Sequence, residues 1–203
     1  MNITPDMVKE LRQRTGSGIM DCKKALQDAD GDIERAIDLL RERGLSAAAK
    51  KAGRIASEGI IESYIHGEGR IGVLLEINCE TDFVARNSEF KNFAHEVAMQ
   101  IAAANPPYVK REDVPEHILQ KEKEIIKTQI INEGKPANIA EKIVEGRIEK
   151  YYKENCLLEQ PYIRNTDMTV EDLLREMITK LGENLVIRRF VRYEVGEGLG
   201  ENE

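Results

Sequence analysis

The amino-acid sequence predicts an α+β protein: a three-helix bundle, then a core made of a small antiparallel sheet with helices on one face and a projecting helical hairpin. Three observations lead to this fold class. Short amphipathic segments separated by glycine-containing breaks fill the first 44 residues. Alternating apolar residues, typical of strands, occur within residues 60–77 and 185–195. Apolar residues at three- and four-residue steps, typical of helices, recur through most of the remaining chain.

The first three helices begin and end at clear sequence signals. Thr4-Pro5 starts the first helix and Gly16-Ser17-Gly18 ends it. The second helix is predicted over Met20–Ala29, the break at Asp30-Gly31-Asp32 follows, and the third helix is predicted to end at Gly44. The apolar positions expected to form the core of this bundle are Met7, Val8, Leu11, Cys22, Ala25, Leu26, Ala29, Ile33, Ala36, Ile37 and Leu40.

The segment Leu45–Ile55 is rich in alanine and has no proline, so it predicts a solvated helical linker. We therefore expect a helical module over residues 1–44, a linker over 45–55 and an α+β core over 56–203. A basic surface for nucleic acid is the alternative interpretation of residues 41–54. Its cationic residues are Arg41, Arg43, Lys50, Lys51 and Arg54.

The sheet is predicted from a hairpin and one later strand. Ile60–Ile65 and Ile71–Ile77 form the hairpin around Gly67-Glu68-Gly69, and Leu185–Val195 supplies the third strand. In the hairpin the inward positions are Ile71, Val73, Leu75 and Ile77. In the third strand, strict alternation places Val186, Arg188, Phe190, Arg192 and Glu194 opposite Ile187, Arg189, Val191, Tyr193 and Val195.

Four helices are predicted to accompany this sheet. Ser88 caps the first, which ends before Pro106-Pro107, and the last spans Thr169–Leu181. Between them, Pro115–Glu133 and Pro136–Asn155 form the hairpin about residues 115–155. The seam of this hairpin is predicted to contain Ile118, Ile125, Ile126, Ile139, Ile143 and Ile148.

Composition excludes several functional classes. The 203 residues carry a formal charge of -7, which opposes general attraction to nucleic acid or to an anionic membrane. The apolar runs are too short to span a bilayer, and the first residues lack a secretory signal, so we expect a cytoplasmic protein. Cys22, Cys79 and Cys156 are odd in number and far apart, which favours reduced structural thiols over disulfides or a zinc site.

The sequence contains no convincing catalytic constellation, metal site or cofactor motif. His95-Glu96-Val97-Ala98-Met99 begins like a metalloprotease helix but has Met where the second His ligand is required. Asp82-Phe83-Val84 lacks the glycine of the kinase triplet. His66 and His117 have no evident nucleophile as partner. We therefore expect a protein that is not an enzyme.

The segment Thr81–Asn87 allows two interpretations. If residues 82–104 form one helix, Phe83 lies seven residues before Phe90 and belongs to the same buried face. However, Arg86-Asn87-Ser88 interrupts the helical pattern, and Thr81 is able to cap a separate turn. In that case Phe83 protrudes as a binding anchor.

Three segments of the chain resemble the signatures of the elongation factor Ts family: Leu11–Leu26, Thr81–Asn87 and Phe190–Gly198. The resemblance implies a translation elongation factor that acts as a guanine-nucleotide exchange factor. Such a protein binds elongation factor Tu with GDP, disturbs its Mg²⁺ site and promotes GDP release and exchange for GTP, with no cofactor and no covalent chemistry.

The same resemblance assigns roles to individual residues. Thr81, Asp82, Phe83 and Val84 match the segment that presses into the nucleotide-binding domain of the partner, with Phe83 as an apolar wedge. Arg12, Ile19 and Met20 match positions at which the N-terminal module, which resembles a ubiquitin-associated module, docks on that domain. In the alternative interpretation, Arg12 only solvates its helix and the other two close the bundle.

Longer members of the family contain two related core subdomains, whereas this chain contains one. The resemblance therefore implies a homodimer and a 2:2 complex, unless a helix covers the free face of the sheet. Two rival functions remain open. One is an adaptor that binds a peptide or a ubiquitin-like protein through the small bundle. The other is an RNA-associated translation protein that uses residues 41–54 with Arg188, Arg189 and Arg192.

Overall fold

The computed structural model describes residues 3–133 and 137–199, without the side chains of residues 137–140. Helices and a small antiparallel sheet are both present, in agreement with the α+β class. The contacts group the chain into two units. Unit 1 comprises Met1–Ile60, Ile77–Phe93 and Asp172–Val186, and unit 2 comprises Ile61–Glu76, Ala94–Glu171 and Ile187–Glu203.

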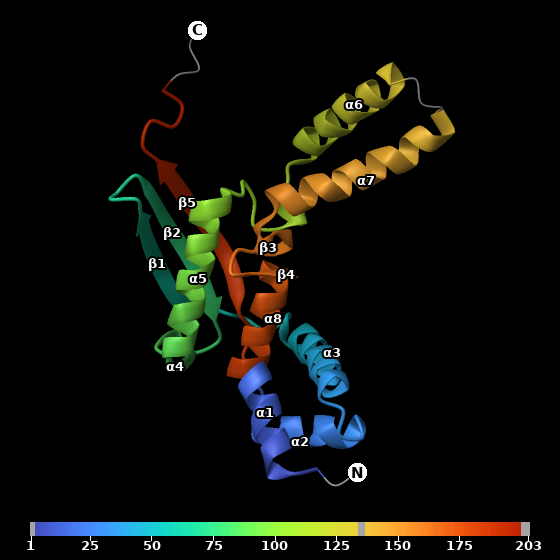
Figure 1. The fold of residues 1–203 in the computed structure, drawn as a ribbon. Coiled ribbons are helices and arrows are strands. Elements are labelled where there is room, and N and C mark those ends of the chain that lie inside the picture. The colour runs from blue at the N-terminus through green and yellow to red at the C-terminus, as the bar shows by residue number, and fades with distance from the viewer. Residues whose placement is uncertain (1–2, 134–136, 200–203) are drawn as a thin grey trace. The chain divides into compact units, whose positions relative to one another are not determined.

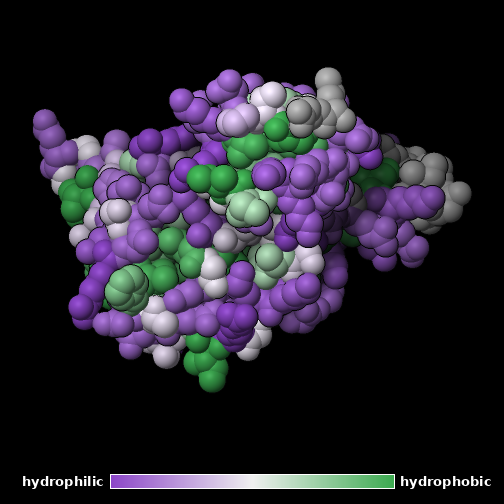
Figure 2. Space-filling view, turned by 90° about the horizontal axis from the view of Figure 1, so that it is seen from below, coloured by the Kyte–Doolittle hydropathy of each residue, from purple (hydrophilic) through white to green (hydrophobic). Residues whose placement is uncertain are grey.

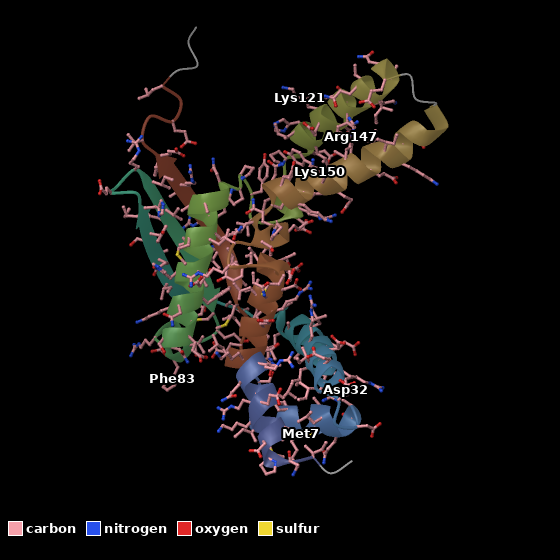
Figure 3. All side chains as sticks on the ribbon, in the orientation of Figure 1. Met7, Asp32, Phe83, Lys121, Arg147 and Lys150 are labelled. Carbon is pink, nitrogen blue, oxygen red and sulfur yellow. The ribbon has the colours of Figure 1, made fainter. Side chains whose placement is uncertain are left out.

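The three-helix bundle lies in unit 1 and consists of α1 (Pro5–Thr15), α2 (Ile19–Asp28) and α3 (Ile33–Lys51). As predicted, the Thr4 hydroxyl accepts a hydrogen bond from the Met7 amide at 3.4 Å. The carboxylate of Asp32, labelled in Figure 3, caps α3 in the same way. The predicted apolar positions are either buried or partly buried in one cluster, which includes Leu11, Cys22, Ala25, Leu26, Ala29 and Ala36.

The third helix does not end at Gly44, as the sequence predicted, but continues to Lys51. Gly44 instead lets α8 (Val170–Leu181) approach closely, since a Cβ at this position would lie 3.2 Å from the Thr179 hydroxyl. That hydroxyl donates a hydrogen bond to the Gly44 carbonyl at 3.3 Å. The glycine therefore serves helix packing and not helix termination.

The main sheet has the strand order β1-β2-β5, with β1 at Glu58–His66, β2 at Ile71–Cys79 and β5 at Val186–Glu194. One face of the sheet is covered by α5 (Ser88–Ala104), as Figure 1 shows. The residues buried beneath and along α5 include Val73, Leu75, Phe90, Phe93, Ala94, Val97 and Ile101. The helix is capped by Asn87 and not by Ser88, because the Asn87 side chain accepts a hydrogen bond from the Glu89 amide at 2.8 Å.

The predicted strict alternation of β5 is wrong in the middle of the strand. Ile187 is buried, yet the next partly covered side chains are Phe190 and Arg192. Arg192 donates from Nε to the Ala102 carbonyl of α5 at 3.3 Å. Between these positions, the adjacent residues Arg188 and Arg189 both bind the Glu76 carboxylate, at 2.6 and 2.7 Å. The alternation of covered and exposed side chains therefore shifts by one residue between Ile187 and Phe190, as it does at a β-bulge.

The helical hairpin of unit 2 consists of α6 (Glu116–Asn132) and α7 (Ala137–Asn155), drawn with labelled side chains in Figure 3. Its seam contains Ile126, Ile130 and Ile148. Ile125 was assigned to this seam wrongly, because it is 42% exposed. The predicted turn at Gly134-Lys135-Pro136 and the side chain of Ile139 lie outside the described residues.

A short two-stranded sheet was not predicted from the sequence. It pairs β3 (Pro161–Tyr162) with β4 (Asn165–Thr169) and precedes α8, so α8 begins one residue later than expected. The buried side chain of Gln100 binds the Pro161 carbonyl at 3.2 Å and the Ile163 amide at 2.9 Å. These two contacts join residues that are 61 and 63 positions apart, so no local pattern in the sequence reveals them.

The close pairing of β1 with β2 requires glycine at position 59. Gly59 has φ of 149°, and a Cβ there would lie 2.1 Å from the Ile77 carbonyl oxygen. We expect Gly59→Ala to lower the free energy of unfolding by about 2–4 kcal/mol, measured by urea denaturation. The control Gly53→Ala, where no atom lies within 4 Å, should change it by less than about 0.5 kcal/mol. Equal stability of the two variants would contradict this account.

Candidate functional site

The residues Thr81–Asn87 form a separate turn between β2 and α5. Thr81 is the N-cap of the short helix α4 (Asp82–Ala85), and its hydroxyl accepts a hydrogen bond from the Val84 amide at 3.4 Å. Arg86 is the C-cap of α4, and Asn87 then caps α5. The alternative in which residues 82–104 form one helix is therefore wrong.

The Phe83 side chain projects from α4 into solvent, as Figure 3 shows. Phe83 is 86% exposed, whereas the next residues, Val84 and Ala85, are buried and anchor the turn. Asp82 is also exposed and pairs with Arg86 at 3.0 Å. An exposed aromatic side chain on an anchored turn is well suited to insert into an apolar pocket of a partner.

The connection between α8 and β5 holds this segment through a carboxylate. Glu183 Oε2 accepts hydrogen bonds from the backbone amides of Glu80 and Thr81, both at 3.0 Å. Its Oε1 accepts a hydrogen bond from the Thr81 hydroxyl at 2.6 Å. Glu183 was not identified from the sequence, because it lies about a hundred positions away from Thr81 and no local motif connects them.

A second set of contacts joins the same segments with the roles exchanged: here Glu80 accepts and Asn184 donates. The Glu80 carboxylate accepts a hydrogen bond from the Asn184 amide at 2.6 Å and pairs with Arg54 at 3.5 Å. The Asn184 side chain in turn donates to the Arg54 carbonyl at 2.8 Å. Asn184 is almost completely buried. We call Arg54, Glu80, Thr81, Glu183 and Asn184 the clasp; all five belong to unit 1.

Cys79 joins the end of β2 to the same turn. Its thiol donates to the Thr81 carbonyl at 3.2 Å. Burial, and secondarily the charge of Glu183, raises the pKa of the Cys79 thiol to about 11, so the thiol stays protonated at neutral pH. Cys22, Cys79 and Cys156 are all free and buried, in agreement with the prediction of structural thiols.

The other predicted contact residues also lie in unit 1. Arg12 is exposed on α1, while Ile19 and Met20 begin α2 and are 55% and 73% exposed. Neither Ile19 nor Met20 belongs to the core cluster of the bundle, so the alternative in which they close it is not supported. No hydrogen bond or ion pair joins these three residues to Phe83 in the described part of the chain.

The basic residues that suggested RNA binding are mostly paired within the protein. Arg41 pairs with Asp172 at 3.5 Å, and Arg43 pairs with Asp28. In unit 2, Arg188 and Arg189 share Glu76 and hold the pKa of that carboxyl below its usual range. Side chains neutralised by internal carboxylates attract phosphate weakly, and these contacts argue against an RNA interface.

The described residues contain no group of three or more His, Cys, Asp or Glu side chains arranged to hold a metal ion. His95 binds Glu62 at 2.9 Å and packs edge-on against Tyr64, which is a structural role. Over the same residues, no helix combines the length and apolar character needed to cross a membrane. The face in Figure 2 is mainly hydrophilic, with separate hydrophobic patches.

Comparison with known proteins gives a consistent result. A family model described as Elongation factor TS matches residues 8–197. The elongation factor Ts of Carboxydothermus hydrogenoformans is 67% identical over 201 residues, which cover 99% of this chain and 93% of that protein. The proteins of the same name from Caldanaerobacter subterraneus subsp. tengcongensis and Alkaliphilus oremlandii are 68% and 64% identical, over 97% and 100% of this chain and 98% and 94% of their own lengths.

The raised pKa of Cys79 predicts a loss of stability in alkaline solution. The ordinary value is 9.0 and the value in the folded protein is about 11, so the unfolded chain releases this proton first. The stabilisation is complete below pH 9 and disappears as the pH rises towards 11. We expect the urea midpoint to fall as the pH rises from about 9 to about 11, and to fall less steeply in Cys79→Ala. Identical pH profiles for the two proteins would contradict this prediction.

Proposed function

The chain belongs to the elongation factor Ts family of translation elongation factors, and on that premise we propose that it is a guanine-nucleotide exchange factor for elongation factor Tu. It binds elongation factor Tu with GDP, disturbs the Mg²⁺ site of that protein and promotes GDP release, so that GTP can enter. It breaks and forms no covalent bond, needs no cofactor and acts in the cytoplasm.

Phe83 is exposed on a turn that Thr81 caps and that the clasp residues hold in place. This observation supports the proposal most directly. Phe83 is the wedge and Asp82 approaches the groups near the metal. Val84, which was expected to contact the partner too, is buried and supports Phe83 from the core side. Thr81 fixes the start of the turn. Arg12, Ile19 and Met20 dock the N-terminal module on the nucleotide-binding domain, where Arg12 pairs with a carboxylate and the other two cover an apolar surface.

The mechanism is a coupling between two binding equilibria. Guanine-nucleotide affinity depends on contacts to phosphate and Mg²⁺, so a wedge that favours an arrangement without those contacts weakens nucleotide binding. By linkage, bound GDP weakens the binding of the wedge to the same extent. An exchange factor therefore needs only non-covalent contacts that differ between the two states of its partner.

We also infer that different parts of the chain have different functions. Residues 1–44, which resemble a ubiquitin-associated module, form the docking module, residues 45–55 link it to the core, and residues 56–203 carry the exchange segment. The helical hairpin about residues 115–155 projects from this core. Its base is supported by Arg111, which binds Glu149 and Glu159 and lies over the Tyr152 ring at 4.5 Å.

Phe83→Ala tests the exchange function. The expected result is a roughly tenfold to hundredfold slower stimulated release of a fluorescent GDP analogue from Mg²⁺-loaded elongation factor Tu, because a central aromatic anchor is lost. Helicity should be unchanged, since the side chain is exposed. The control Leu199→Ala removes a side chain of similar exposure, 87%, outside the segment and should behave as wild type. Binding of the wild-type protein without faster release would favour an adaptor function instead.

We further propose that two copies pair through the open face of the sheet, giving a 2:2 complex with elongation factor Tu. The support comes from unit 2, where the face opposite α5 carries exposed apolar side chains. A Cβ at Gly72 would lie 3.4 Å from Ile65 Cδ1, which puts Ile65 on the same face as Leu74 and Glu76. The exposed apolar residues of this face are Ile61, Ile65, Leu74, Val191 and Tyr193.

The carboxylate of Glu76 is not left as an unpaired charge in this face, because Arg188 and Arg189 both bind it. An exposed apolar surface of this kind on a small sheet is typical of an interface. A symmetric partner presents the same surface in return, so each copy covers the other.

Leu74→Glu tests the dimer. By sedimentation equilibrium, we expect a dimer for the wild-type protein and a dissociation constant at least about tenfold higher for the variant, because an apolar contact would be replaced by a charge that must lose its water. Leu199→Glu, which adds the same charge at another exposed position, should leave the association unchanged. A monomeric wild-type protein across working concentrations would refute the proposal.

A further inference from the structure

The segment that carries Phe83 is too short to keep its conformation without help. The helix α4 contains four residues, and a single helical turn is unstable in isolation because ordering its backbone costs more than its few hydrogen bonds return. Val84 and Ala85 contribute apolar burial on one side only. The conformation of the exposed side of α4 must therefore be fixed from its N-terminal end.

Glu183 supplies three acceptor contacts at that end. Both carboxylate oxygens are used, one by the amides of Glu80 and Thr81 and the other by the Thr81 hydroxyl. Hydrogen bonds to a charged acceptor are stronger than neutral ones. These contacts fix the backbone at the two residues that immediately precede α4.

The contact with the Thr81 hydroxyl transmits this restraint into α4. The hydroxyl has one proton, which it donates to Glu183 Oε1 at 2.6 Å. Its lone pair is then directed to the Val84 amide, from which it accepts at 3.4 Å. A continuous chain of hydrogen bonds therefore runs from Glu183 through Thr81 to the residue after Phe83.

We propose that Glu183 is a positioning residue for nucleotide exchange: its carboxylate preorganises α4 so that Phe83 enters the partner without first being ordered. This inference rests on the proposed exchange function. A preorganised anchor avoids the entropic cost of ordering at the moment of binding. Glu183 itself does not need to touch the partner, and the bundle residues continue to supply docking.

The first experiment measures the GDP release rate as a function of the concentration of the exchange factor. In Glu183→Ala we expect the maximal stimulated rate to fall roughly tenfold, while the half-saturating concentration changes less than about threefold. Glu183→Gln retains one acceptor oxygen and should give an intermediate rate. Glu149→Gln, which alters a carboxylate that binds Arg111 in the other unit, is the control and should match wild type.

A double-mutant cycle separates positioning from a general loss of folding. If Glu183 acts through Phe83, the variant with both Glu183→Ala and Phe83→Ala should release GDP as slowly as Phe83→Ala alone. Independent, multiplying effects would overturn the proposal. An equal maximal rate for Glu183→Ala and wild type would overturn it as well.

Hydrogen exchange of the free protein provides a readout that does not depend on the partner. In Glu183→Ala, the amides of residues 80–86 should exchange at least about tenfold faster, while those of residues 90–101 in α5 stay protected. Unchanged exchange at residues 80–86 would refute the positioning role. If the wild-type protein fails to accelerate GDP release, the exchange function is wrong, and the hydrogen-exchange result still decides whether Glu183 holds the segment.

Discussion

The position of the candidate functional segment depends on one carboxylate, that of Glu183, in the connection between α8 and β5. It binds the chain at the point where β2 has ended and α4 has not yet begun. Asn184 and Glu80 form the reciprocal contact, and the linker joins through Arg54. Three segments that are remote in sequence therefore meet through polar contacts, while apolar packing secures only the inner side of α4.

Helix α8 makes contacts with several other elements of unit 1. Thr179 of α8 binds the Gly44 carbonyl of α3, and Lys180 pairs with Glu89 of α5 at 2.9 Å. Arg41 of α3 reaches Asp172 at the other end of α8. The same helix thus contacts the bundle, α5 and, through the residues that follow it, the clasp. These contacts favour a fixed arrangement of the elements of unit 1. The proposed function does not require a conformational change in this protein.

Local sequence patterns were sufficient for most of the secondary structure, but they left both a buried and an exposed position open for Phe83, and the structure decides for the exposed one. The helix cap at Thr4, the break at Asp30-Gly31-Asp32, the hairpin glycines and the interruption at Arg86-Asn87-Ser88 are all short-range signals. Features that depend on distant contacts could not be predicted in this way. The close approach at Gly44, the phase change between Ile187 and Phe190, and the contribution of Glu183 each require knowledge of which segments lie side by side.

The clasp also has a consequence for synthesis of the chain. Thr81 and its acceptor on Glu183 are separated by 102 positions, so the ribosome completes α5, the helical hairpin and α8 before the acceptor exists. A nascent chain that already exposes Phe83 outside the ribosome still lacks the restraint on α4. The restraint on α4 therefore forms only after α8 and Glu183 have left the ribosome, long after Thr81 itself has emerged.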